Sequence, residues 1–388
     1  MTTSIEITGD VFRWARKRAN ISIERLAKTV NTKPEKILAW ERETEYPNYR
    51  QAQKVASALS VPLGYLFLAE PPEISIPIAD FRTLPGKENA EISPNLQEVL
   101  DDALRKRDWY TEWRKEEGLA PFEYVGKFST ESDPDDLIQN MRQTLDIPPD
   151  FAASMGSWDE HLRKFVQQVE NAGVLVLQSG IVGTNTHRKL SVEEFRGFAL
   201  ANEFAPLIFI NSVDSTAARI FTLAHELIHL WTGTSGISSP EITLNQKEIQ
   251  KIELFCNYAA AEFLVARSAF LRRWDKFRNA VDNAQSLAKY FRVSAQVILR
   301  RSYELELIPA DEFFQAFQEV LKASKPPKKG GGGSFYNNLF SRNSRRFTTE
   351  LVFAVSGGHV TYAEAAHLLN TSPGKVANVI EKLRKTGE

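Results

Sequence analysis

Residues 225–229 read His-Glu-Leu-Ile-His, a spacing of residue types that is typical of metal-dependent hydrolysis. They lie in an apolar, helix-favouring run that begins at Ala217. Residues four apart share one face of a helix, so His225 and His229 can reach one ion while Glu226 projects beside it. We therefore expect a metal site with Glu226 as its general base. The alternative is two partly buried histidines on an amphipathic helix.

Two histidines leave a catalytic zinc ion one protein ligand short. Glu253 is the best candidate, because it opens a second apolar helical run in which Asn257 follows one turn later and can orient a ligand. Glu248 and Glu262 are rivals, and the alternative for Glu253 is a solvated helix face. We expect Zn²⁺, although Mn²⁺ or Fe²⁺ also suits this ligand set. Cys256 is expected to be a small packing residue.

Such a site suits peptide hydrolysis. A zinc ion with three protein ligands acidifies water and polarises a carbonyl group. Glu226 would take the proton of the water and pass it to the departing amine. An edge strand near the site can hold an extended peptide by main-chain hydrogen bonds, and residues 196–200 are our candidate for it.

Composition places the chain among cytoplasmic globular proteins. Its 388 residues are 43% hydrophobic, enough for about two or three domains with cores of their own. One cysteine cannot form an intramolecular disulfide, and charges interrupt the first thirty residues where a signal peptide would be apolar. No window reaches the roughly 18 apolar residues that span a bilayer. We expect no membrane partner.

Charge is unevenly distributed along the chain. Residues 1–70 hold 11 basic and 8 acidic side chains, residues 71–262 hold 17 and 30, and residues 263–388 hold 20 and 11. The two ends can approach a polyanion and the middle would repel one. Uneven solvated faces are common, so charge alone does not establish nucleic-acid binding.

The expected fold class is α+β and mostly helical, with a small sheet formed by short apolar runs between residues 174 and 210. Periodicity and composition divide the chain into six segments. These are a five-helix unit at 1–70, a helical connecting region at 71–159, a core around the metal motif at 160–270, a helical segment at 271–324, a Pro/Lys/Gly linker at 325–334, and a small helical unit at 335–388.

Three stretches around the metal motif, residues 207–211, 221–230 and 253–260, resemble the ImmA/IrrE family of metallo-endopeptidases. The likeness covers roughly residues 160–270. It implies a zincin-like fold with a third glutamate ligand, and a protein substrate, often a DNA-binding repressor, that is cut at a limited site. Residues 286–294 resemble the helix-turn-helix-like element that follows the peptidase core in this family.

Residues 9–67 are similar to the XRE, or Cro/C1-type, helix-turn-helix family, with Leu26-Ala27 in the second helix and Trp40-Glu41-Arg42 closing the third. The positions expected to face a major groove lack the Arg, Asn or Gln of strong base readers. We therefore predict weak DNA binding; the alternative is a module for dimerisation or for a protein partner. The candidate DNA-contacting residues are Lys33, Glu35, Lys36, Ala39 and Arg42.

The function expected from these features is regulation of gene expression, for example in a stress response, by limited cleavage of a repressor or antitoxin-like protein. One alternative is a non-catalytic helix-turn-helix regulator whose metal domain serves as a sensor, and another is an antitoxin. Glu226 favours the enzyme, because a structural metal site has no use for a base at that position. The oligomeric state is open, and a homodimer is one option.

Overall fold

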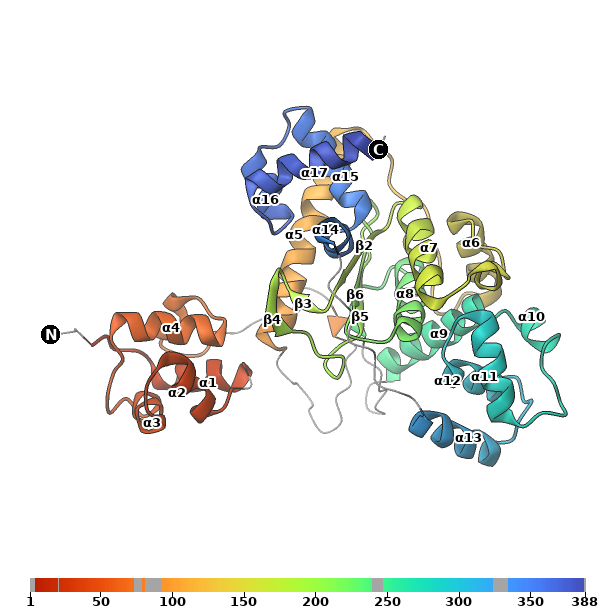
Figure 1. Ribbon diagram of the computed structural model, residues 1–388, viewed down its shortest axis with the longest axis horizontal. Coiled ribbons are helices and arrows are strands. Elements are labelled where there is room, and N and C mark those ends of the chain that lie inside the picture. The colour runs from red at the N-terminus through yellow and green to blue at the C-terminus, as the bar shows by residue number, and fades with distance from the viewer. Residues whose placement is uncertain are drawn as a thin grey trace. The chain divides into compact units, whose positions relative to one another are not determined.

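A computed structural model describes residues 4–19, 21–72, 79–80, 92–238, 247–323 and 334–386 (Figure 1). The described chain is mostly helical with a small sheet, which confirms the predicted fold class. None of its described helices is long and apolar enough to cross a membrane. Packing divides it into two units, one of Met1–Pro77 with Lys87–Asp101 and the other of Ile78–Gly86 with Asp102–Glu388. The predicted linker at 325–334 lies outside the described residues, apart from Ser334.

The N-terminal part of the first unit consists of five short helical segments, as predicted, the fifth being a 3-10 helix. Ser22 accepts a hydrogen bond from the backbone of Arg25, and Asn48 forms a capping box with Gln51. The core contains Phe12 and Trp40, both fully buried. The segments are α1 (Gly9–Arg18), α2 (Ile23–Val30), α3 (Pro34–Glu41), α4 (Tyr49–Leu59) and η1 (Leu63–Phe67).

Four helical segments lie in the chain between β1 (Ala79–Asp80), the first strand of the sheet, and the remaining strands. Asp133 and Ser157 cap two of the helices by accepting hydrogen bonds from backbone N–H groups in their first turns, and both helices coincide with stretches of helical periodicity in the sequence, residues 134–145 and 158–171. The segments are α5 (Pro94–Glu116), which runs on from the first unit, α6 (Pro134–Leu145), the 3-10 helix η2 (Phe151–Ser154), and α7 (Trp158–Asn171).

The sheet has five strands in the order β1-β7-β5-β6-β2. β6 pairs in parallel with β2 and antiparallel with β5, and β7 pairs antiparallel with β5 and in parallel with β1. A separate β3-β4 hairpin stands apart from it. The strands are β1 (Ala79–Asp80), β2 (Leu175–Ser179), β3 (Ile181–Val182), β4 (Asn185–Lys189), β5 (Gly197–Leu200), β6 (Leu207–Asn211) and β7 (Gly236–Ser238).

The prediction that residues 196–200 form an edge strand is wrong. β5 lies inside the sheet, hydrogen-bonded to β6 along one side and to β7 along the other. Its four residues are buried accordingly. β7 is only three residues long and starts at Gly236, so the alternating pattern that reveals a strand in a sequence is absent there.

Helices from the middle of the chain enclose the main core, and the first of them, which carries the metal motif, packs on β5 and β6. The core includes Phe165 from α7, Ile208 from β6 and Leu227 from the helix of the metal motif. The helices are α8 (Thr216–Trp231), α9 (Lys247–Leu264), α10 (Arg267–Leu271), α11 (Ala280–Phe291), α12 (Ala295–Glu304) and α13 (Ala310–Ala323).

Four C-terminal helices pack on α5, α7 and β2 of the same unit (Figure 1). Trp109 and Trp113 of α5 stack on each other, with ring centroids 5.9 Å apart, and meet Phe347 and His359 edge-on. The helices are α14 (Phe335–Asn343), α15 (Arg345–Ser356), α16 (Tyr362–Leu368) and α17 (Pro373–Thr386).

A buried carboxyl group, that of Glu170 at the end of α7, joins the C-terminal helices to the rest of the unit. It accepts hydrogen bonds from the Ser344 hydroxyl at 2.5 Å and from the Arg345 backbone N–H at 2.9 Å. Burial raises the pKa of Glu170 to about 7, although these hydrogen bonds act in the opposite direction. The folded protein therefore holds the neutral acid more readily than the unfolded chain does.

Stability is expected to depend on pH through Glu170. Because its folded pKa of about 7 lies above the ordinary value of 4.5, its contribution is complete below the unfolded pKa and is lost as the pH rises through the folded one. Glu170→Gln keeps a neutral side chain, so its melting temperature relative to wild type should rise between about pH 5 and pH 8. Glu319→Gln, at an exposed site, is the control. If the melting temperatures of Glu170→Gln and wild type differ by the same amount at both pH values, the raised pKa of Glu170 is contradicted.

Candidate metal centre

The metal motif lies in the second half of α8, which follows β6 after a four-residue turn. The hydroxyl of Ser215 caps the helix by accepting a hydrogen bond from the Ala218 backbone. From Thr222 to Trp231 every side chain is buried, so this half of α8 runs through the core. The motif thus lies inside the core, where α9 packs against one side of the helix and β5 against another.

The crossing of α8 and α9 brings three ligand groups together. The Nε2 atoms of His225 and His229 are 3.1 Å apart. The carboxylate of Glu253 places one oxygen 3.3 Å from Nε2 of His225 and the other 3.3 Å from Nε2 of His229. Ligand atoms about 2.0–2.1 Å from a tetrahedral zinc ion lie roughly 3.3 Å from one another. The three groups therefore fit one such ion.

Burial makes the electrostatics of this cluster strong. Burial alone would raise the pKa of Glu253, but the charges and hydrogen bonds of the two imidazoles outweigh it and lower that pKa. Burial lowers the pKa of His229, so its imidazole favours the neutral, ligating form. A carboxylate and two imidazoles enclosed in this way form a donor set for a cation.

The rival ligands are engaged elsewhere or are not described. Glu262 forms a salt bridge with the buried Arg301 and accepts a hydrogen bond from the Arg267 backbone at 2.8 Å. The side chain of Glu248 lies outside the described residues. Cys256 is fully buried with its sulfur 3.8 Å from Nδ1 of His229, and burial raises the pKa of its thiol well above the usual value. Its full burial agrees with the packing role expected from the sequence.

Each histidine has a polar side chain beside its ring. Asn257 interacts with the imidazole of His225, and its role as an orienting partner stays a prediction. Nδ1 of His229 lies 2.8 Å from the hydroxyl of Thr234. Sequence reasoning missed Thr234. Gly233 has a positive φ, and the chain therefore turns back after α8 so that Thr234 lies beside the end of that helix. A threonine just beyond the glycine that ends the helix was the available signal.

Glu226 is fully buried on the side of α8 that faces β5. Its neighbour there is Gly197, where an added Cβ would lie 3.1 Å from Oε1 of Glu226, 2.7 Å from Cγ2 of Thr222 and 2.9 Å from the backbone oxygen of Phe209. The absence of a side chain at Gly197 therefore leaves the space that the Glu226 carboxylate occupies. Sequence reasoning named Gly197 only as part of the predicted strand.

A loop from the connecting region satisfies the carbonyl groups at the C-terminal end of α8. The backbone N–H groups of Gly126 and Phe128 donate to the carbonyl oxygens of Leu230 and Trp231, at 2.9 and 3.0 Å. Gly126 and Gly233 have positive φ, and the Cα of Gly126 would lie 3.0 Å from a Cβ at Gly233. The close approach of two glycines thus fixes the end of the helix only two residues beyond His229.

The candidate DNA-contacting residues belong to α3 and its ends. Lys33, Glu35, Lys36 and Arg42 are exposed and Ala39 is half-buried. Lys36 lies 3.7 Å from the carboxylate of Glu45 across an exposed surface. Two other arginines of this unit, Arg13 and Arg16, instead bind the buried Glu41, which ties them to the fold.

Comparison with known families is consistent with this geometry. The family model described as IrrE N-terminal-like domain, of the peptidase class, matches residues 169–303, and a helix-turn-helix family model matches residues 12–66. The chain therefore joins a helix-turn-helix domain to an IrrE N-terminal-like peptidase domain, and the predicted fusion is confirmed. Comparisons with curated proteins and with solved structures gave no match.

Replacing His225, His229 or Glu253 by Ala removes one of three ligands and should abolish tight zinc binding. Thr234→Val removes only the hydroxyl that meets His229 and should weaken binding by about 10–100-fold. Competition with a chromophoric chelator measures both effects.

His187→Ala, at an exposed position of β4, is the matched control and should bind zinc as wild type does. If Glu253→Ala keeps the wild-type affinity while Glu248→Ala or Glu262→Ala loses it, the third ligand has been assigned wrongly.

Gly197→Ala should overpack the contact between β5 and α8, at a cost of about 1–3 kcal/mol in the free energy of unfolding. The backbone oxygen of Phe209 cannot give way as a flexible side chain would. Gly374→Ala is the control, because a Cβ there would meet nothing within 4 Å. Chemical denaturation compares them, and equal stability of the two variants would show that Gly197 is not tightly enclosed.

Proposed function

We propose that the chain is a metal-dependent endopeptidase in which His225, His229 and Glu253 hold the ion and Glu226 is the general base. The observation that carries the proposal is the convergence of three ligand side chains. The two histidine Nε2 atoms are 3.1 Å apart and each lies 3.3 Å from one oxygen of Glu253, while a second buried carboxylate, that of Glu226, follows His225 on the same helix. Zinc suits the donor set best, and manganese or iron can replace it.

A divalent ion in this set supplies Lewis acidity that polarises a peptide carbonyl and acidifies water. The chain's own contribution is to hold the donors and to move protons. Glu226 takes a proton from the attacking water and delivers it to the nitrogen of the departing amine, which balances the cleavage of one peptide bond. Apolar packing around α8 limits access of other water to these groups, which strengthens the interactions among them.

We propose a protein substrate, a repressor or antitoxin-like protein cut at a limited site, in a cytoplasmic regulatory setting. The N-terminal helix-turn-helix domain supports this assignment, because it can bring the peptidase to DNA or to a DNA-bound protein. Since β5 is internal, the substrate does not add to the sheet along residues 196–200. The six-part domain division and a homodimer remain part of the proposal.

Glu226→Gln keeps the size of the side chain and removes its basicity, so proteolysis should fall by about 10²–10⁴-fold while the metal stays bound. Wild type and variant are compared in the native host under inducing stress. The regulated phenotype and the integrity of candidate repressor proteins are both scored, and new protein N-termini are mapped by mass spectrometry.

Glu203→Gln, at an exposed position, is the matched control and should behave as wild type. If Glu226→Gln holds metal normally and matches wild type in phenotype and in repressor integrity, catalysis is not the function. A non-catalytic regulator or an antitoxin that uses the metal domain as a sensor then takes its place.

A further inference from the structure

Among the described residues, two other pairs of α-helices, α11-α12 and α16-α17, share the turn geometry of α2-α3. In each pair a left-handed residue comes one or two residues after the end of the first helix, and the next helix begins three residues later. The left-handed residues of the three pairs are Asn31, Arg292 and Asn370, with φ of 57°, 53° and 50°. The turn from α4 to the 3-10 helix η1, with Ser60 left-handed, has this geometry too.

The three turns also share a hydrogen bond and a packing position. The N–H group after the left-handed residue donates to an alanine carbonyl five residues earlier: Thr32 to Ala27, Val293 to Ala288, and Thr371 to Ala366. Such a bond ends many helices, so it does not define the motif alone. The second helix packs on the first each time, and its residue six positions past the left-handed one is buried; these residues are Ile37, Ile298 and Val376.

The second of these motifs does not offer its second helix to a partner. Ala295 and Val297 of α12 pack against the main core. Arg301 is fully buried in its salt bridge with Glu262, and Arg300 pairs with Glu304 at 3.1 Å. This motif is therefore a structural part of the peptidase unit.

The first motif exposes its second helix but carries mixed charge there. Glu35 and Lys36 are adjacent on α3, and Lys36 is close to Glu45. An anion in the middle of a surface that must approach phosphates weakens binding. The helix-turn-helix family match, at residues 12–66, covers this motif and not the third.

The third motif presents an exposed basic stripe on α17. Lys375, Asn378, Lys382 and Lys385 are all exposed and recur at three- and four-residue spacing along one face of the helix. Glu381 is the only acidic residue among the described residues of α17, and its exposed carboxylate pairs with Lys385 at 2.5 Å, so Lys385 must exchange this partner for a phosphate when DNA binds. Its buried side is apolar and consists of Val376, Val379, Ile380 and Leu383.

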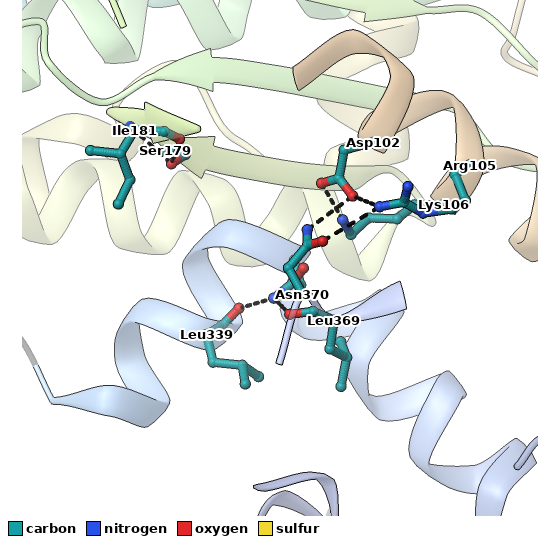
Figure 2. A network of polar contacts seen from close by, with 9 residues as sticks. Asp102, Arg105, Lys106, Ser179, Ile181, Leu339, Leu369 and Asn370 are labelled. Atoms are coloured by element: carbon teal, nitrogen blue, oxygen red, sulfur yellow. Dashed lines mark hydrogen bonds and ion pairs between the residues drawn. The ribbon is translucent and has the colours of Figure 1, made fainter. Parts of the chain in front are cut away.

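The turn of this motif is anchored to the rest of its unit by residues outside the stripe. The side chain of Asn370 donates to Asp102 of α5 at 2.9 Å, and Asp102 also binds Arg105 and the buried Lys106 (Figure 2). Asn343 donates to the carbonyl oxygen of Leu369 at 3.3 Å. The motif is thus held in place while the stripe stays exposed.

We propose that α16 and α17 form a further DNA-binding helix-turn-helix, in which α17 enters the major groove of double-stranded DNA. Lys375, Lys382 and Lys385 contact phosphates, and Asn378 supplies the paired donor and acceptor that match an adenine edge. The charge of the stripe favours a polyanion over an apolar protein partner. DNA is then bound from the peptidase unit itself, independently of catalysis.

The test uses the full chain and a fluorescent, mixed-sequence DNA duplex of roughly 20 base pairs, with binding followed by anisotropy between about 50 and 200 mM salt. Replacing Lys375, Lys382 and Lys385 together by Gln should weaken binding by about tenfold or more. It should also lower the slope of log affinity against log salt by about three, because each of the three lysines neutralises one phosphate in the wild-type complex.

Replacing Lys33, Lys36 and Arg42 of α3 by Gln removes the same charge and is the matched control, which should lose less affinity than the α17 variant. Asn378→Ala should reduce the preference for duplexes selected from a random pool by about tenfold. Circular dichroism melting confirms that each variant is folded. The proposal is overturned if wild type binds no duplex at the lowest salt, if the α17 variant binds as wild type does, or if single-stranded RNA of equal length binds more tightly.

Discussion

The structure of the second unit depends on one electrostatic constraint, the enclosure of the Glu253 and Glu226 carboxylates with two imidazoles where α8 crosses α9. Carboxylates are rarely buried without a partner, because removing a charge from water is costly. The imidazoles of His225 and His229, which face Glu253, offset part of the cost of burying its carboxylate. A divalent cation bound by the three ligands would offset the rest. Metal binding and stability are therefore expected to be linked in this protein.

The remaining elements can be understood as supports of that crossing. β5 lies under α8 and leaves space for Glu226 at Gly197, while the loop that contains Gly126 binds the last carbonyl groups of α8. Thr234, from the turn after α8, lies 2.8 Å from Nδ1 of His229, and Asn257 of α9 interacts with the imidazole of His225. Further away, Glu170 joins the C-terminal helices to α7, so that the basic stripe of α17 belongs to the same packed unit as the metal centre.

Local signals predicted much of this structure, and long-range pairing accounts for what they missed. The ligand spacing at 225–229 and the helices at 134–145 and 158–171 depend on periodicity and caps within a few residues. β5 is internal only because β7 pairs with it. β7 comes after α8 in the chain, is three residues long and shows no alternating pattern, so the sequence does not reveal it. Thr234 likewise reaches His229 only because of a turn whose geometry the sequence does not state.

The central claim, that two imidazoles and one carboxylate hold a catalytic ion without sulfur, is tested most directly by X-ray absorption at the zinc edge. The full chain loaded with one equivalent of zinc should show about four nitrogen or oxygen ligands near 2.0–2.1 Å, with the outer-shell pattern of two imidazoles. Glu226→Gln should leave the spectrum unchanged, because Glu226 is not a ligand. A sulfur shell near 2.3 Å would place Cys256 in the coordination sphere and contradict the account.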